Sequence, residues 1–361
     1  MLKYLFAILI IGVIIFVHEL GHFVAAKLCG IKVLKFAIGM GPKIIGKQIG
    51  ETEYSLRILP IGGFCAMEGE EEDPVSKHEL GEDAKSQSRR SIQNCPIWQR
   101  FLVFFAGPFM NLVLGFIVAV IATCLYSAVP STQVSQFHVL SETDNTIVAE
   151  SYESGLREGD IIKEINGMNI LTTSDLAYQL QVGENGKFDV VVERNGESLE
   201  LDNVKFFNKA TKSNVDFFVK GLNKNPINVV SYSFKNTVST TRLTWTSIID
   251  LVRGRQKFSD MSGPVGIAGA IGDAATSGKT ARESVMSILN LSMLISINLG
   301  IINLLPIPGL DGGRILFLII EAIRRKPIKP EHEGIVNLIG LALVMLFILA
   351  VTFNDVLRLV G

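Results

Sequence analysis

The chain has 361 residues, of which 48% are hydrophobic and 19% are charged, and its formal net charge is -1. Because basic and acidic residues nearly balance, the composition gives no argument for nucleic-acid binding or for a strongly acidic partner. The hydrophobic fraction is high for a water-soluble globular protein, so the distribution of the apolar residues along the chain becomes the informative feature.

Apolar residues are concentrated in four stretches that approach or exceed the roughly 20 residues a helix needs to cross a bilayer. These stretches are residues 4–26, 101–129, 285–305 and 335–353. The first continues past His22 without a small-residue cleavage site, which favours a retained span over a removed signal peptide. The pattern predicts a polytopic α-helical membrane protein with about four transmembrane helices.

Lysine and arginine are distributed unevenly between the connecting segments. The first and third connections are rich in them, whereas "PSTQVSQFHVLSETDNTIVAE", after the second span, contains neither. The positive-inside rule therefore predicts that the first and third loops are cytoplasmic, and that the long second loop and both termini lie outside.

The segment after the first span mixes β-branched residues with closely spaced glycines, which predicts two or three short strands. The polar stretch "EEEDPVSKHELGEDAKSQSRRS" that follows has the composition of a linker.

The second loop predicts a small β-rich domain. We expect a strand in "TIVAE" (146–150), a helix over Asp175–Leu180 and a two-residue hairpin turn at Asn195-Gly196. "GLREGDIIKEINGMNI" resembles the stretch of PDZ domains in which a glycine turn leads into a buried strand.

Apolar residues then recur every three or four positions from Val230 to Val252, which predicts an amphipathic helix. Two settings are open for this helix, namely the outer membrane surface or the face of the small domain. "MSGPVGIAG" is expected to be an irregular loop that returns the chain to the bilayer. Pro306 and Pro308 should break the third span, because proline cannot continue a regular helix.

The most informative motif is "HELGH", in the first apolar stretch. His18 and His22 are four residues apart, so on a helix they project from one face, with Glu19 nearby. HExxH is the spacing by which a helix supplies two imidazoles to zinc and one carboxylate to the attacking water. Ionisable groups inside a span are costly unless they bind something, which strengthens this interpretation. A second HELG at His78 lacks the second histidine and lies in the charged linker, so we interpret it as coincidence.

A catalytic zinc usually has three protein ligands, and the third should lie at the same membrane depth. Asp311 meets this requirement, since it follows the proline break near the cytoplasmic end of the third span. A helix N-cap is the alternative role for this aspartate.

"HELGH", "GGFCAM", "AGPFMN", "GPVGI" and "NLLPIPGLDGGR" together resemble the site-2 protease family of intramembrane zinc metalloproteases. The similarity is to the bacterial branch, like the regulator of sigma-E protease, with one PDZ domain between the second and third spans. It implies spans at 1–28, 98–129, 285–323 and 334–355, a membrane-associated β-hairpin region at 29–68, a cytoplasmic linker at 69–97, an extracytoplasmic PDZ-like domain at 130–224, an amphipathic helix with return loop at 225–284, and a cytoplasmic loop at 324–333.

The resemblance also implies roles for individual residues. His18, His22 and Asp311 would bind Zn²⁺, and Glu19 would act as general base and acid. Substrate contacts are implied for Asn303, Pro306, Pro308, Gly63 and Phe64, and Asn111 would support the cavity or serve only in helix packing. The family usually has Val-Lys where Cys65-Ala66 stand here, so this part of the chain departs from the pattern.

The expected function is therefore an endopeptidase that cleaves single-span membrane proteins in the bacterial cell membrane, after a first cut has shortened them. Anti-sigma factors and signal-peptide remnants are the substrates that the resemblance implies, and the PDZ-like domain would dock or filter them. The alternatives are a zinc-binding transporter, which has no need for Glu19, and a non-catalytic adaptor that acts through the PDZ-like domain.

Overall fold

The computed structural model describes residues 2–70, 90–139, 147–182, 186–208, 215–254, 262–276, 278, 280–326, 328 and 330–360. Contacts divide the chain into one unit of Met1–Val118 with Ser247–Gly361 and a second unit of Ala119–Thr246. His78 and the predicted linker around it lie outside the described residues.

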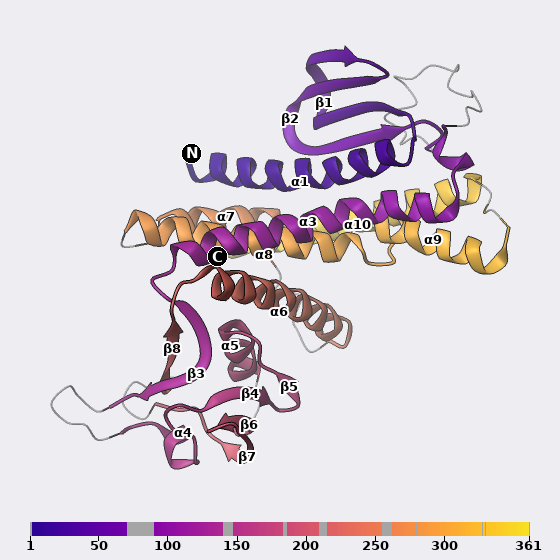
Figure 1. Ribbon diagram of the computed structural model, residues 1–361. Coiled ribbons are helices and arrows are strands. Elements are labelled where there is room, and N and C mark those ends of the chain that lie inside the picture. Colours follow the sequence, from indigo (N-terminus) through magenta and orange to yellow (C-terminus); the bar gives the residue numbers. More distant parts are fainter. Residues whose placement is uncertain are drawn as a thin grey trace. The chain divides into compact units, whose positions relative to one another are not determined.

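The first unit contains long apolar helices (Figure 1). They are α1 (Leu2–Leu28), α3 (Ile97–Leu125), α8 (Ala281–Asn303) and α10 (Pro330–Val360), accompanied by the 3-10 turn η2 (Ile92–Asn94) and the shorter helices α7 (Pro264–Thr276) and α9 (Asp311–Arg324). Among the described residues, four segments are long and apolar enough to span a membrane, namely Phe6–Leu28, Ile97–Leu125, Ala281–Asn303 and His332–Arg358. The prediction of four spans is confirmed.

The third predicted span is divided, as its prolines predict. α8 begins after the N-cap residue Thr280, whose hydroxyl accepts from the backbone N–H of Glu283, and it ends at Asn303. A loop carrying Pro306 and Pro308 then leads into α9, whose first residue is Asp311. The metal-ligand candidate of this span thus lies at a helix start next to irregular backbone.

Two long strands follow α1, where shorter ones were predicted. In β1 (Val33–Ile49) and β2 (Thr52–Met67), Ala37 pairs with both Ser55 and Phe64. The first half of β1 therefore lies between the two halves of β2, and the curled sheet covers the C-terminal half of α1 (Figure 1). Gly62–Met67, which we call the edge strand, pairs on one side only among the described residues.

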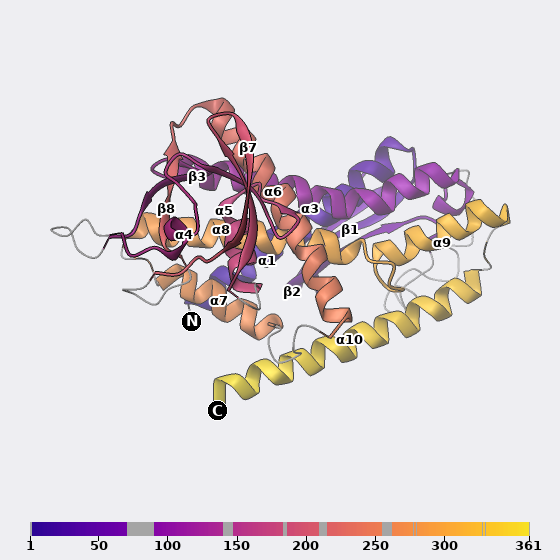
Figure 2. The same cartoon turned by 90° about the horizontal axis from the view of Figure 1, so that it is seen from below.

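The expectation of an irregular loop at "GPVGIAG" is wrong, because α7 begins at Pro264. Proline suits the first helical position, where its missing N–H costs nothing. The carboxylate of Asp355 on α10 accepts from the backbone N–H groups of Gly263 (3.1 Å) and Gly266 (2.8 Å) and so caps the helix. A β-carbon at either glycine would lie within about 3 Å of that carboxylate, so the glycines permit its approach. Figure 2 shows α10 at the margin of the helical unit.

Replacing Asp355 with Ala should lower the free energy of unfolding by about 1 to 3 kcal/mol, because buried backbone donors lose their acceptor. Asp355→Asn should lose less, since its amide oxygen can still accept one bond. Thermal unfolding in detergent micelles measures both variants. Equal midpoints for the wild type and Asp355→Ala would contradict this role of the carboxylate.

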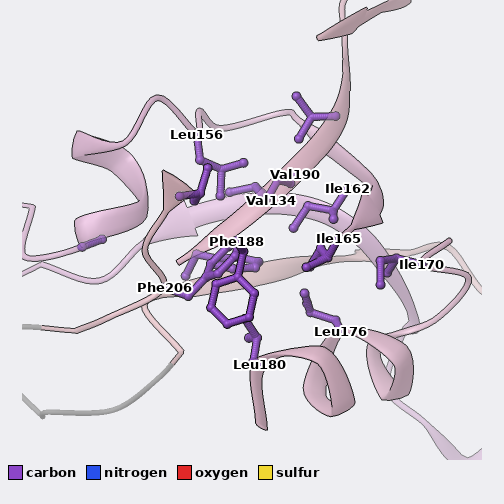
Figure 3. Close-up of a cluster of buried hydrophobic side chains, with 14 of the residues drawn as sticks. Val134, Leu156, Ile162, Ile165, Ile170, Leu176, Leu180, Phe188, Val190 and Phe206 are labelled. Carbon is purple, nitrogen blue, oxygen red and sulfur yellow. The ribbon is translucent and has the colours of Figure 1, made fainter. Parts of the chain in front are cut away.

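The second unit contains a β-sheet with the strand order β7-β6-β4-β3-β8, and β5 pairs with β4. Its elements are β3 (Val129–Phe137), α4 (Glu150–Glu153), β4 (Ile161–Ile165), β5 (Met168–Asn169), α5 (Thr173–Val182), β6 (Phe188–Arg194), β7 (Glu197–Val204), β8 (Phe217–Leu222) and the first part of α6 (Pro226–Val252). Figure 3 shows its apolar core, in which Leu156, Ile162 and Val190 are among the fully buried side chains.

Two sequence predictions for this unit are confirmed and one is wrong. The predicted helix lies within α5, and Asn195 and Gly196 both have positive φ in the β6–β7 hairpin turn. Residues 147–150 do not form the strand predicted in "TIVAE", because Ile147 and Ala149 make only isolated bridges and α4 begins at Glu150.

α6 presents two different faces. Its polar face is buried, where the Ser239 hydroxyl donates to Asp175 (2.5 Å) and the Arg242 guanidinium pairs with the same carboxylate (2.7 Å). Its apolar stripe is exposed and comprises Ile227, Val230, Phe234, Val238, Trp245, Ile249 and Val252. The helix therefore packs on the small unit through these polar groups and through the buried Val229 and Tyr232, and it leaves its apolar stripe open.

Candidate metal centre

Two helices bring the predicted ligands together. α1 carries His18 and His22 one turn apart, and their ring centroids are 4.8 Å from each other. α9 adds Asp311 from its first turn. One ligand atom from each of the three residues lies within 4.8 Å of the others, and both histidines are buried.

The spacing of the three ligand atoms fits a zinc ion. The Nε2 atom of His18 is 3.2 Å from Nε2 of His22 and 3.1 Å from Oδ2 of Asp311. The distance from Nε2 of His22 to Oδ2 of Asp311, the third side of this triangle of ligand atoms, is 3.4 Å. Tetrahedral bonds of 2.0–2.2 Å place ligand atoms about 3.3–3.6 Å apart. The two imidazoles and the carboxylate are therefore arranged as three corners of such a site.

The far side of each imidazole has a partner on α3. Nδ1 of His22 donates to the backbone carbonyl of Val103 at 2.8 Å, which leaves Nε2 of His22 free to bind a metal. The Nδ1 atom of His18 lies 3.2 Å from the amide of fully buried Asn111, whose Oδ1 has no hydrogen-bond partner. If the Asn111 amide is turned by half a turn, its Oδ1 can accept a hydrogen bond from Nδ1–H of His18. A metal bound at Nε2 of His18 requires this tautomer, in which Nδ1 carries the proton. The contacts behind the rings thus also fit a metal ion.

A small residue on α3 makes room for the second ligand. A β-carbon at Gly107 would fall on the His22 ring, with Nε2 as the nearest atom and Cδ2 at 2.9 Å. Gly21 on α1 faces the backbone of Ala106 with similarly little space. These two glycines let α1 and α3 approach closely around the imidazole.

Glu19 lies between the candidate ligands and the edge strand. It directly follows His18 on α1, the helix that also carries His22. On the other side, a β-carbon at Gly63 would lie 3.1 Å from Cγ of Glu19. The edge strand therefore passes directly beside the Glu19 side chain.

The remaining predicted residues lie in the edge strand, at the end of α8, in the loop before Asp311 and on α3. Phe64, in the edge strand, is half-buried under the guanidinium of Arg57, which is 4.7 Å from its ring centroid. Asn303 ends α8, and Pro306 and Pro308 lie in the loop that precedes Asp311. Asn111 is fully buried and contacts the ring of His18, so its position suits a role in orienting that imidazole.

Sequence analysis missed two functional candidates, Val103 and Gly107. The carbonyl of Val103 carries no side-chain signature, so no sequence signal could have identified it. Gly107 lies within the quoted "AGPFMN", where a glycine in an apolar helix was the available signal of close packing.

Two buried histidines on a candidate membrane-spanning helix and an aspartate from α9 thus lie at metal-ligand spacing, and Glu19 directly follows the first histidine. The family model for Peptidase family M50 matches residues 6–347. The chain is 33% identical to the regulator of sigma-W protease RasP of Bacillus subtilis, covering 98% of this chain and 97% of that protein. It is also 33% identical to a putative zinc metalloprotease of Clostridium acetobutylicum, covering 97% and 96%.

The chain belongs to Peptidase family M50, the site-2 proteases. It is accordingly a multi-pass bacterial membrane protein and an intramembrane zinc metalloprotease.

Proposed function

We propose that His18, His22 and Asp311 hold the zinc ion and that Glu19 is the catalytic base, in an enzyme that makes the second cut in single-span membrane proteins. The triangle of ligand atoms, 3.1–3.4 Å on each side, carries this proposal. When bound, zinc supplies a Lewis acid that polarises the scissile carbonyl and makes water a stronger acid. Glu19 then takes the proton from the attacking water and passes it to the leaving amine.

We further propose that the edge strand holds the substrate in place for cleavage. A transmembrane helix keeps its carbonyls in internal hydrogen bonds, so it must unwind before it is cut. We propose that the unwound backbone pairs with Gly62–Met67, since strand addition replaces the lost bonds. Gly63 next to Glu19 supports this, because a substrate strand on that edge would pass the carboxylate. Phe64, Asn303, Pro306 and Pro308 would contact the same strand.

The β-rich unit is proposed to be an extracytoplasmic PDZ-like domain that docks or filters substrates. The absence of lysine and arginine from residues 130–150 supports the outer side for this unit. The exposed apolar stripe of α6 supports contact with the outer membrane surface. Anti-sigma factors and signal-peptide remnants are the proposed substrates. Prior removal of their exterior domains would let them pass the PDZ-like domain and reach the active site.

A reconstituted cleavage assay tests this function. The purified full chain would be incubated in liposomes with a tagged model protein of one apolar helix, with either a short exterior tail or a folded exterior domain. We expect cleavage of the short-tailed form, slower cleavage of the other, loss of activity with a zinc chelator and recovery with added Zn²⁺. Cleavage that persists after complete zinc removal, or no cleavage of either protein, would contradict the proposal.

A further inference from the structure

Arg314 lies one turn after Asp311 on α9, and its side chain reaches two other parts of the helical unit. Its Nη1 atom pairs with Oε1 of Glu70, just beyond the edge strand. Its guanidinium also lies over the ring of Phe104 on α3, 5.1 Å from the ring centroid. A residue of the aspartate-bearing helix therefore touches both the sheet and the helix that supports the histidines.

Glu70 continues this contact into the edge strand. Its second oxygen, Oε2, accepts from the backbone N–H of Met67 at 3.2 Å, and Met67 is the last residue of β2. The backbone N–H of Glu70 in turn donates to the carbonyl of Met67, also at 3.2 Å. One carboxylate thus joins the end of the edge strand to Arg314.

The contact with Phe104 connects the pair to the histidine side of the site. Phe104 is buried, and it directly follows Val103, whose carbonyl accepts from His22. The planar guanidinium suits this position, because it can stack on a ring and donate to a carboxylate at the same time. Arg314 therefore lies where the aspartate-bearing helix, the histidine support and the edge strand meet.

We propose that Arg314 and Glu70 are a positioning pair, which sets the edge strand relative to Asp311 and so determines which substrate bond faces the metal. The inference rests on the proposed function, because it assumes that substrate pairs with Gly62–Met67. Neither residue needs to touch the substrate. A displacement of about 1 Å at a reacting centre can cost roughly a hundredfold in rate, so a shifted strand should be costly.

The chain contains a matched control. Arg100 on α3 pairs with Glu321 on α9 at 2.5 Å, and both side chains are largely buried. This pair also joins α9 to a neighbouring element, but it involves no residue of the edge strand. Its removal reports what the loss of an ion pair on α9 does to the protein as a whole.

The test uses the purified full chain and the short-tailed model protein, with the variants Arg314→Ala, Glu70→Ala, their double variant, Arg314→Lys and the controls Arg100→Ala and Glu321→Ala. Bound zinc, the thermal midpoint, kcat, KM and the cleaved bond, identified by mass spectrometry, are measured for each. We expect each single pair variant to keep one zinc and to lose about 10- to 100-fold in kcat/KM. The loss should fall mainly on kcat, and the cut should spread to neighbouring bonds.

The double variant should be no worse than the poorer single variant, because both changes remove the same contact. Arg314→Lys keeps the positive charge but lacks the planar guanidinium with its fixed set of N–H donors. Its cleavage rate should therefore lie between those of Arg314→Ala and the wild type. The control variants should lower the thermal midpoint while leaving the cleaved bond unchanged and kcat/KM close to the wild-type value.

Three results would overturn the inference: pair variants that lose zinc, pair variants that cleave the same bond at the wild-type rate, or control variants that shift the cut equally. A wild-type protein that does not cleave at all would instead overturn the proposed function, and the inference would fall with it. If the wild type cleaves and the pair variants cut the same bond at the same rate, the positioning role of Arg314 and Glu70 would be refuted while the proposed function would stand.

Discussion

Glu19→Gln should abolish cleavage while zinc stays bound. The amide preserves the size of the side chain and is not one of the three candidate ligands, but it cannot take a proton from water. Loss of a general base typically costs 10²- to 10⁴-fold, so kcat/KM should fall by about that factor. The comparison requires the rate of cleavage of the model protein and the zinc content of the same preparations.

The matched control for this prediction is Glu193→Gln, since Glu193 is a partly exposed glutamate on β6 whose carboxylate pairs with Lys163. It should cleave at the wild-type rate. A Glu19→Gln protein that still cleaves at more than a tenth of that rate would exclude Glu19 as the base. One that loses zinc would make Glu19 part of the metal site itself.

Gly107→Ala should remove most of the zinc although Gly107 is not a ligand. The added methyl group would occupy the position of the His22 ring, which is held from its other side by the carbonyl of Val103 at 2.8 Å. The ring must move, and changes around a ligand typically cost 10- to 100-fold in metal affinity. Competition with a fluorescent zinc chelator measures this affinity.

Gly269→Ala on α7 is the control, because a β-carbon there would meet nothing within 4 Å. It should bind zinc as the wild type does. If Gly107→Ala also kept full affinity and activity, the close approach of α3 to His22 would have no bearing on the metal.

The arrangement of the three candidate metal ligands was largely predictable because its main signals are local. A four-residue spacing fixes the two histidines on one helical face, and an aspartate after a proline break is conspicuous in an apolar span. The partners on α3 were not predictable in the same way. Val103 acts through its carbonyl, and the contact between Asn111 and His18 depends on how α1 and α3 pack.

The incorrect predictions about the fold also arose because local sequence does not show contacts between distant parts of the chain. Glycine and proline in "GPVGIAG" are typical of a loop, but the glycines make room for Asp355, some 90 residues later in the chain, and the proline begins a helix. The curled sheet was predicted as short strands, since its glycines also indicate turns. Local composition could not show that one half of β1 lies between the two halves of β2.

The central claim is that His18, His22 and Asp311 bind the zinc ion. Zinc-edge X-ray absorption of the purified full chain tests it most directly, because the spectrum reports the identity and distance of the ligand atoms. We expect two imidazole nitrogens at about 2.0–2.1 Å with oxygen completing the shell at about 2.0–2.2 Å. A sulfur shell at about 2.3 Å, as Cys65 or another thiolate would give, or a spectrum without imidazole scattering, would contradict the account.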